Sequence, residues 1–173
     1  MIEVVVESIR ISLVSQHRIV MLKELDNARQ LPIWIGPFEA EAITMELQDV
    51  KVARPGTHDL LKNVISELGG RVSHVLIKAL HDSVFHASIF IDVNGKLHEI
   101  DCRSSDAIAL AVRVKVPIFV NRSVMDEAGI LPEPDLQETE LKDEEESASE
   151  ESETMDVFSD FLDTLDFDDF EDD

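Results

Sequence analysis

The residues best able to do chemistry gather where Asp101 and Asp106 flank Arg103, Ser104 and Ser105. Carboxylate oxygens are ligands that Mg²⁺ or Mn²⁺ prefers, and a guanidinium offsets the charge that builds on phosphate oxygens during phosphodiester cleavage. This pattern predicts Asp101 and Asp106 as metal ligands and catalytic groups, with Arg103 and the two serines contacting substrate. The alternative is a serine-capped helix start in which Arg103 forms a salt bridge with an aspartate.

A second polar group follows Arg54, in the run Arg54-Pro55-Gly56-Thr57-His58-Asp59. His58 could act as a general base, Asp59 could supply a further carboxylate, and Arg54 could contact a phosphate. The alternative is a structural helix start, in which Thr57 is the cap, Asp59 faces the helix dipole and His58 is a packed polar residue.

Two further candidates, Lys78 and His86, come from predicted strands. Asn94-Gly95 is typical of a two-residue type I′ hairpin turn, which pairs Ser88 with Asp101. Extending this register to the preceding strand pairs Lys78 with His86 on the same face as Asp101. We therefore expect Lys78 and His86 to contact substrate beside Asp101.

These residues need a scaffold that the hydrophobic pattern predicts in outline. We expect an α+β fold, in which a mixed β-sheet with an antiparallel meander and hairpins packs against three main helices. A slip in the alternation between Val6 and Ile9 indicates a bulge. The predicted strands are 2–13, 19–25, 31–35, 72–80, 84–93, 96–101 and 117–120. The predicted helices are 38–47, 57–68, a buried helix after Ser105, and 123–128.

The run Asp101-Cys102-Arg103-Ser104-Ser105-Asp106 with the apolar helix after it resembles the D-x-R-P-S-D-A-I-A-L-A-x-R block of the bifunctional nuclease (BFN) family, formerly a domain of unknown function. Two more blocks agree, Leu31-Pro32-Ile33-Trp34-Ile35-Gly36 and Arg54-Pro55-Gly56-Thr57-His58-Asp59-Leu60-Leu61. Ser104 stands where that family has proline. The resemblance implies a nuclease for RNA and DNA, assisted by Mg²⁺ or Mn²⁺. The competing interpretation is a non-catalytic regulatory or binding module for an anion or a protein.

Charge divides the chain into a domain, residues 1–132, and a tail, residues 133–173. The domain has 14 Lys and Arg against 17 Asp and Glu, whereas the tail has 1 Lys against 20 Asp and Glu, so most of the net charge of −22 lies in the tail. Such a composition predicts disorder. Within the tail, segment 156–170 carries an apolar helical face suited to a protein partner or to docking on the domain itself. That face consists of Phe158, Phe161, Leu162 and Leu165.

Cys102 is the only cysteine, which excludes an intramolecular disulfide and a thiolate zinc cluster. We expect no signal segment and no membrane span, and therefore a cytoplasmic protein. An unpaired edge of the apolar strand 2–13 would promote aggregation. We therefore expect a homodimer that covers this edge.

Overall fold

The computed structural model describes residues 1–12 and 17–132, and the predicted tail lies outside the described residues. The strands are β1 (Ile2–Ile11), β2 (Arg18–Glu24), β3 (Gln30–Ile35), β4 (Gly70–His81), β5 (Val84–Val93), β6 (Lys96–Arg103) and β7 (Ile118–Val120). The helices are α1 (Pro37–Leu47), α2 (Thr57–Glu67), α3 (Ser104–Val114) and α4 (Arg122–Ala128). The fold is α+β, as predicted.

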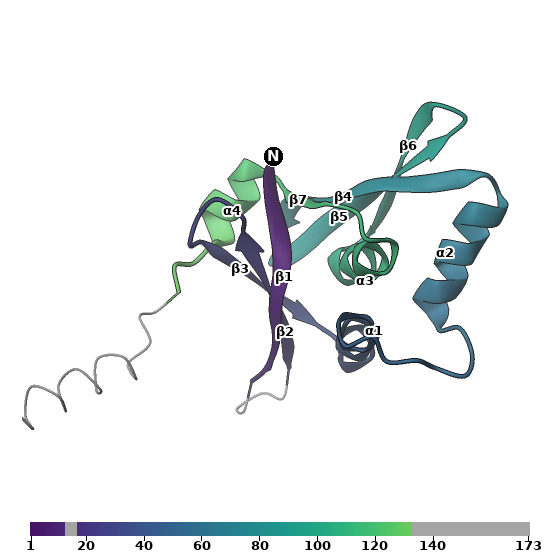
Figure 1. Cartoon of the computed structure of the whole chain (residues 1–173). Helices are drawn as coiled ribbons and strands as arrows, with labels where there is room; N and C mark the ends of the chain where they lie inside the picture. Colours follow the sequence, from purple (N-terminus) through teal and green to yellow (C-terminus); the bar gives the residue numbers. More distant parts are fainter. Residues whose placement is uncertain (13–16, 133–173) are drawn as a thin grey trace, which may run out of the picture. The chain divides into compact units, whose positions relative to one another are not determined.

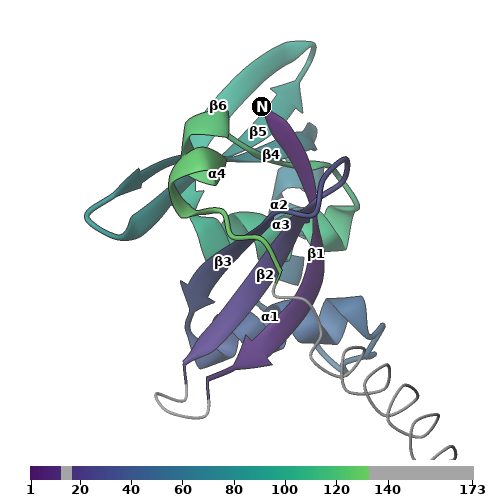
Figure 2. The same ribbon diagram turned by 90° about the vertical axis from the view of Figure 1, so that its left-hand side faces the viewer.

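All seven strands belong to one sheet with the order β3-β2-β1-β7-β4-β5-β6. The sheet is mixed, because β7 pairs parallel with β4 and antiparallel with β1. Figure 1 shows α1 and α3 end-on beside each other, with α2 on their far side from β1. Figure 2 shows α4 on the opposite side of β1, β2 and β3 from those helices. No helix within residues 1–12 and 17–132 is long and apolar enough to cross a membrane.

The meander of β1, β2 and β3 matches its prediction closely. All its strand pairs are antiparallel, and the register of β1 against β2 shifts between Val6 and Ser8, where the bulge was expected. Strand β1 ends at Ile11 rather than at residue 13. The strand edge that motivated the homodimer is covered in part within the chain, because β1 pairs with β2 on one side and, from Ile2 to Val4 only, with β7 on the other.

The hairpin at Asn94-Gly95 sets the register that places Asp101. Both turn residues have positive φ, 55° and 79°, and Ser88 pairs with Asp101 as predicted. The predicted pairing of Lys78 with His86 is wrong, because His86 pairs with Ala79 and the register shifts between Ile77 and Ala79. The bulge follows from a tight two-residue turn at Asp82-Ser83, where φ is again positive in both residues.

Helix α3 is the central element, as its unbroken apolar sequence predicted. Its buried apolar residues are Ala107, Ile108, Ala109, Leu110 and Ala111. The predicted serine cap is wrong, because Arg103 is the N-cap residue and no side chain caps this end. Ser104 and Ser105 instead lie buried in the first turn, 7% and 6% exposed.

Helices α1 and α2 both pack against α3 but differ in how many of their own residues are buried. Ala40 and Ile43 are the buried residues of α1, whereas Phe38 in its first turn is 80% exposed. No residue of α2 is buried, although its apolar residues follow the predicted one-sided spacing. The predicted cap at Thr57 is wrong as well, because α2 begins at Thr57 and the Asp59 carboxylate accepts the Gly56 N–H at 2.8 Å.

Lys115 ends α3 in a left-handed conformation, with φ 56° and ψ 49°. A side chain at this position is strained, and glycine is the usual residue there. We therefore expect Lys115→Gly to raise the free energy of unfolding by about 1 kcal/mol. Urea titration of the full-length chain checks this, with Lys51→Gly as the control, because Lys51 lies in a loop without positive φ. Equal midpoints for the two variants would contradict the prediction.

Candidate active site

Three charged side chains and a histidine from three helix starts meet in one connected group. Arg103 donates to both oxygens of Asp106, from Nε to Oδ2 at 2.7 Å and from an amino nitrogen to Oδ1 at 2.9 Å. Its other amino nitrogen donates to Glu39 of α1 at 2.8 Å. The imidazole Nε2 of His58 lies 3.3 Å from Asp106 Oδ1. The tertiary structure thus brings His58, Arg103 and Asp106, which come from two separate runs of the sequence, together.

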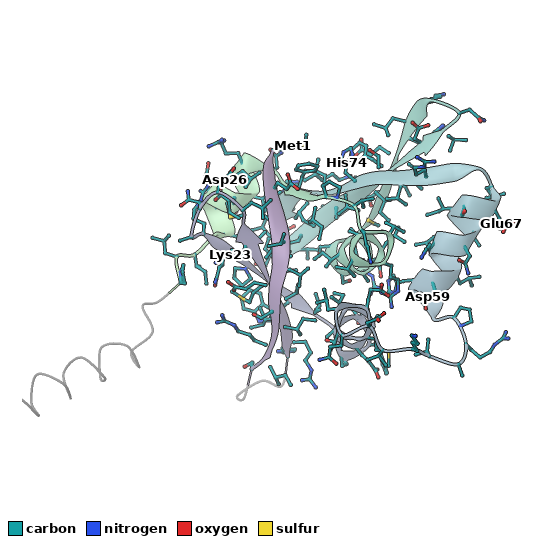
Figure 3. The ribbon with its side chains drawn as sticks, in the orientation of Figure 1. Met1, Lys23, Asp26, Asp59, Glu67 and His74 are labelled. Carbon is teal, nitrogen blue, oxygen red and sulfur yellow. The ribbon has the colours of Figure 1, made fainter. Side chains whose placement is uncertain are left out.

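Asp59 lies next to this group and anchors α2 to α3. Besides accepting the Gly56 N–H, its carboxylate accepts a hydrogen bond from Arg113 Nε at 2.9 Å. The Arg113 side chain is 7% exposed and also donates to the Ala109 carbonyl within its own helix. Figure 3 shows Asp59 at the opposite end of α2 from Glu67. In this structure Asp59 holds the helix start that carries His58.

The electrostatics keep the aspartates of the site ionised. Burial acts to raise the pKa of Asp106, but hydrogen bonds from Arg103 and His58 outweigh it, so the pKa is lowered. The pKa of Asp59 is lowered first by the Gly56 N–H, against the opposing effect of burial, with Arg113 adding to the decrease. The pKa of Arg103 is raised chiefly by its hydrogen bonds to Asp106. Asp106 and Arg103 therefore form a fixed ion pair at neutral pH.

These side chains line a cavity of about 460 Å³. Its apolar lining includes Phe38 and Met45 of α1 and Val52 of the loop that follows. The charged lining consists of three guanidiniums (Arg54, Arg103, Arg113) and five carboxylates (Glu39, Glu41, Glu46, Asp59, Asp106). Arg54 has no ion-pair partner among the described residues. The cavity is thus net acidic, with one unpaired guanidinium at its wall.

Asp101 does not share a ligand set with Asp106. Its side chain is 73% exposed and forms an ion pair at 2.8 Å with Lys78, which lowers the pKa of Asp101. Lys78 also donates to the buried Ser88 hydroxyl, which in turn donates to Glu99. No three His, Cys, Asp or Glu side chains within residues 1–12 and 17–132 gather as a metal site would require. Asp101 and Asp106 thus have different ion-pair partners, Lys78 and Arg103, although both aspartates line one hollow together with His58.

The remaining predicted contacts lie around this site. His86 pairs in register with Arg103, and its charge contributes to lowering the pKa of Asp101. Ser104 and Ser105 line a second hollow of about 270 Å³ together with Arg103. The pKa of the Cys102 thiol is raised to about 11, first by burial and then by the nearby aspartates, which makes this cysteine a poor nucleophile.

Two participants in the site, Glu39 and Arg113, were not among the residues selected from sequence. Glu39 had a ready explanation as an acidic residue in the first turn of a helix. Arg113 carried a clearer signal, because it is the only polar residue between Ala107 and Val114. A single charge on a buried helix requires a partner, but only the fold shows that the partner is Asp59.

Comparison of the sequence with known proteins assigns this chain to a family. The profile of the bifunctional nuclease domain matches residues 20–133, which include every residue of the cavity group. The chain belongs to the bifunctional nuclease domain family. An uncharacterized protein of Mycobacterium tuberculosis is 38% identical over 168 residues, 97% of each chain.

Plant members of the bifunctional nuclease family match a smaller part of the chain. Bifunctional nuclease 2 of Oryza sativa subsp. japonica is 33% identical over 118 residues, 66% of this chain and 36% of its own. Bifunctional nuclease 1 of Arabidopsis thaliana is 32% identical over 111 residues, 61% of this chain and 34% of its own. This chain therefore covers about a third of the length of these plant relatives.

The Asp106 ion pair makes stability depend on pH. Because the folded-state pKa of Asp106 is lowered, its contribution is complete above the unfolded pKa of about 3.9 and is lost as pH falls through the folded value. We expect Asp106→Asn to lower the free energy of unfolding at pH 7 by about 1–3 kcal/mol, with the difference shrinking below about pH 4.

Urea titrations at pH 7, 5 and 3 measure this difference. Asp126→Asn is the control, because Asp126 forms an ion pair with Arg29 but is 57% exposed. A difference between wild type and Asp106→Asn that stayed constant down to pH 3 would contradict the prediction.

Proposed function

We propose that this protein hydrolyses phosphodiester bonds of RNA and DNA at the cavity formed by His58, Arg103 and Asp106. The observation that carries the proposal is the His58–Asp106–Arg103 chain at the wall of a cavity large enough for a small ligand. The names of the plant relatives, bifunctional nuclease, support the same class of reaction.

His58 is the general base in this proposal. When Nε2 donates its proton to Asp106, the opposite nitrogen, Nδ1, is unprotonated and can take a proton from water. Asp106 would hold that tautomer, and Arg103 would keep Asp106 ionised. The activated water would then attack the phosphorus and the P–O bond to the leaving group would break. The leaving oxygen would take up a proton from solvent and depart as an alcohol, and His58 would release to solvent the proton that it had taken from water.

Arg103 would stabilise the charge that develops on the phosphate oxygens. A guanidinium has five N–H groups, and the three hydrogen bonds of Arg103 to Asp106 and Glu39 use three of them. Two N–H groups remain for a phosphate, and the side chain is 67% exposed. Arg54 would add a second contact from the cavity wall.

The need for Mg²⁺ or Mn²⁺ stays a prediction. Asp101 and Asp106 line one hollow, and each forms an ion pair there, with Lys78 and with Arg103. Mg²⁺ commonly binds through one or two carboxylates together with substrate phosphates. An ion that arrived with the nucleic acid would fit this lining, since five carboxylates there outnumber three guanidiniums.

We expect His58→Ala to lower kcat by about 10²–10⁴-fold on single-stranded RNA and DNA, because it removes the general base. Cleavage is measured with Mg²⁺, with Mn²⁺ and with EDTA, and circular dichroism confirms folding. The control is His98→Ala on β6, an exposed histidine outside this cavity. Equal loss in both variants would contradict the assignment. Binding without cleavage in every metal condition would favour the alternative, a non-catalytic module that recognises an anion or a protein.

We also propose that the protein associates as a homodimer, now through α2 rather than through β1. The outer residues of α2 leave a largely apolar surface in the monomer, with Leu60 59%, Val64 44% and Leu68 77% exposed. Light scattering at micromolar concentration should give the dimer mass, and Val64→Asp should reduce it to the monomer mass. A monomeric wild-type protein would contradict this proposal. A partner for segment 156–170 and a cytoplasmic location stay predictions.

A further inference from the structure

Two aromatic side chains stand exposed on either side of Arg103. Trp34 is 60% exposed and Phe38 is 80% exposed, and they are the two aromatic residues among the largely exposed apolar side chains of the described chain. Trp34 lines the hollow of about 270 Å³, and Phe38 lines the cavity of about 460 Å³. Arg103 and Glu39 line both. The two aromatics therefore flank the same guanidinium from separate hollows.

The backbone explains why neither side chain is buried. Strand β3 alternates, so that Ile33 and Ile35 enter the core at 1% and 7% exposure while Trp34 points away from it. Phe38 lies in the first turn of α1, whose buried residues begin at Ala40. Only three residues separate Trp34 from Phe38, so the Cα atoms of the two aromatic residues lie within about 14 Å of each other.

Exposed aromatics beside a guanidinium suit unpaired nucleobases. Each base presents a π-face that can stack on an aromatic ring, and this stacking tolerates any sequence. Bases inside a duplex are stacked on one another and cannot use such platforms. The net charge of the larger cavity also favours stacking. Its five carboxylates weaken the electrostatic attraction of phosphate groups, so base stacking is left as the main source of affinity.

We propose that Trp34 and Phe38 are two base-stacking platforms that select single-stranded nucleic acid and place the phosphate between two successive bases at Arg103. The inference rests on the proposed nuclease site and names its substrate class. One base would enter the hollow beside Trp34 and the next the cavity beside Phe38. The phosphate that joins them would face His58, which lines the same cavity as Phe38.

The test measures binding separately from cleavage. The probe is fluorescein-labelled oligothymidylate, used alone and as a duplex with oligoadenylate, in the presence of EDTA or Ca²⁺, with the integrity of the strand checked on a gel. Because Trp34 is the only tryptophan of the chain, quenching of intrinsic fluorescence reports stacking at that position directly. Anisotropy of the label gives the affinity of each full-length variant.

We expect Trp34→Ala and Phe38→Ala each to weaken single-strand binding about 5- to 100-fold, whereas Trp34→Phe and Phe38→Tyr stay within about threefold of wild type. Because both side chains are exposed, these changes should not unfold the domain. Leu25→Ala is the matched control, since Leu25 is 53% exposed and lines neither hollow. With Arg103 and Arg54 as the phosphate contacts, the slope of log affinity against log salt should be no steeper than about −1.4.

Each outcome decides the inference independently of catalysis. Quenching by the single strand, weaker duplex binding and losses confined to the two alanine variants support it, even if no condition yields cleavage. Alanine variants that bind like Leu25→Ala, or equal affinity for duplex and single strand, overturn it. Cleavage by a protein whose alanine variants bind normally would leave the proposed nuclease function standing and remove the stacking platforms. Absence of single-strand binding by the wild-type protein would also overturn the inference.

Discussion

The burial of α3 is the constraint on which the rest of the structure depends. Five consecutive residues of this helix, 107 to 111, are completely excluded from solvent, so α3 packs against its neighbours on every side. A helix in that position can expose charge only near its ends. Its N-terminal end carries Arg103 and Asp106, whereas Arg113 in its last turn is buried and paired with Asp59. The candidate site is therefore built where the buried helix comes to the surface.

Helix α2 depends on this arrangement for its position. Because it has no buried residue, hydrophobic packing holds it less firmly than it holds α1 or α3. The ion pair between Asp59 and Arg113 joins its first turn to the buried helix, and the same carboxylate caps that turn at Gly56. Arg113 is nearly inaccessible, so loss of its partner would leave a buried charge unpaired. One carboxylate thus links stability to the placement of His58.

The charge distribution distinguishes this site from a simple anion-binding pocket. Most guanidiniums of the cavity are already paired with carboxylates of the chain, which fixes their geometry but reduces their attraction for a free phosphate. A fixed donor fork beside an oriented histidine suits a reaction in which charge develops during bond cleavage. Substrate binding must then draw on surfaces other than the charged ones, and the exposed Trp34 and Phe38 line the two hollows that Arg103 also lines.

The sequence by itself determined the α+β class, nearly every strand and helix, the β1 bulge and the hairpin register at Asn94-Gly95, because each follows from local alternation, spacing or turn chemistry. It also placed His58, Arg103 and Asp106 at helix starts. Only the tertiary structure decided that His58 and Glu39 join the Arg103–Asp106 pair and that Asp59 meets Arg113. The bulge beside Lys78 shifted one predicted pairing, and Asp101 joined Lys78 rather than Asp106. The local sequence pattern specifies which face of a helix or strand a residue occupies. The partner of a charge on another element depends on how distant elements pack, and the residues next to it in the chain do not determine that packing.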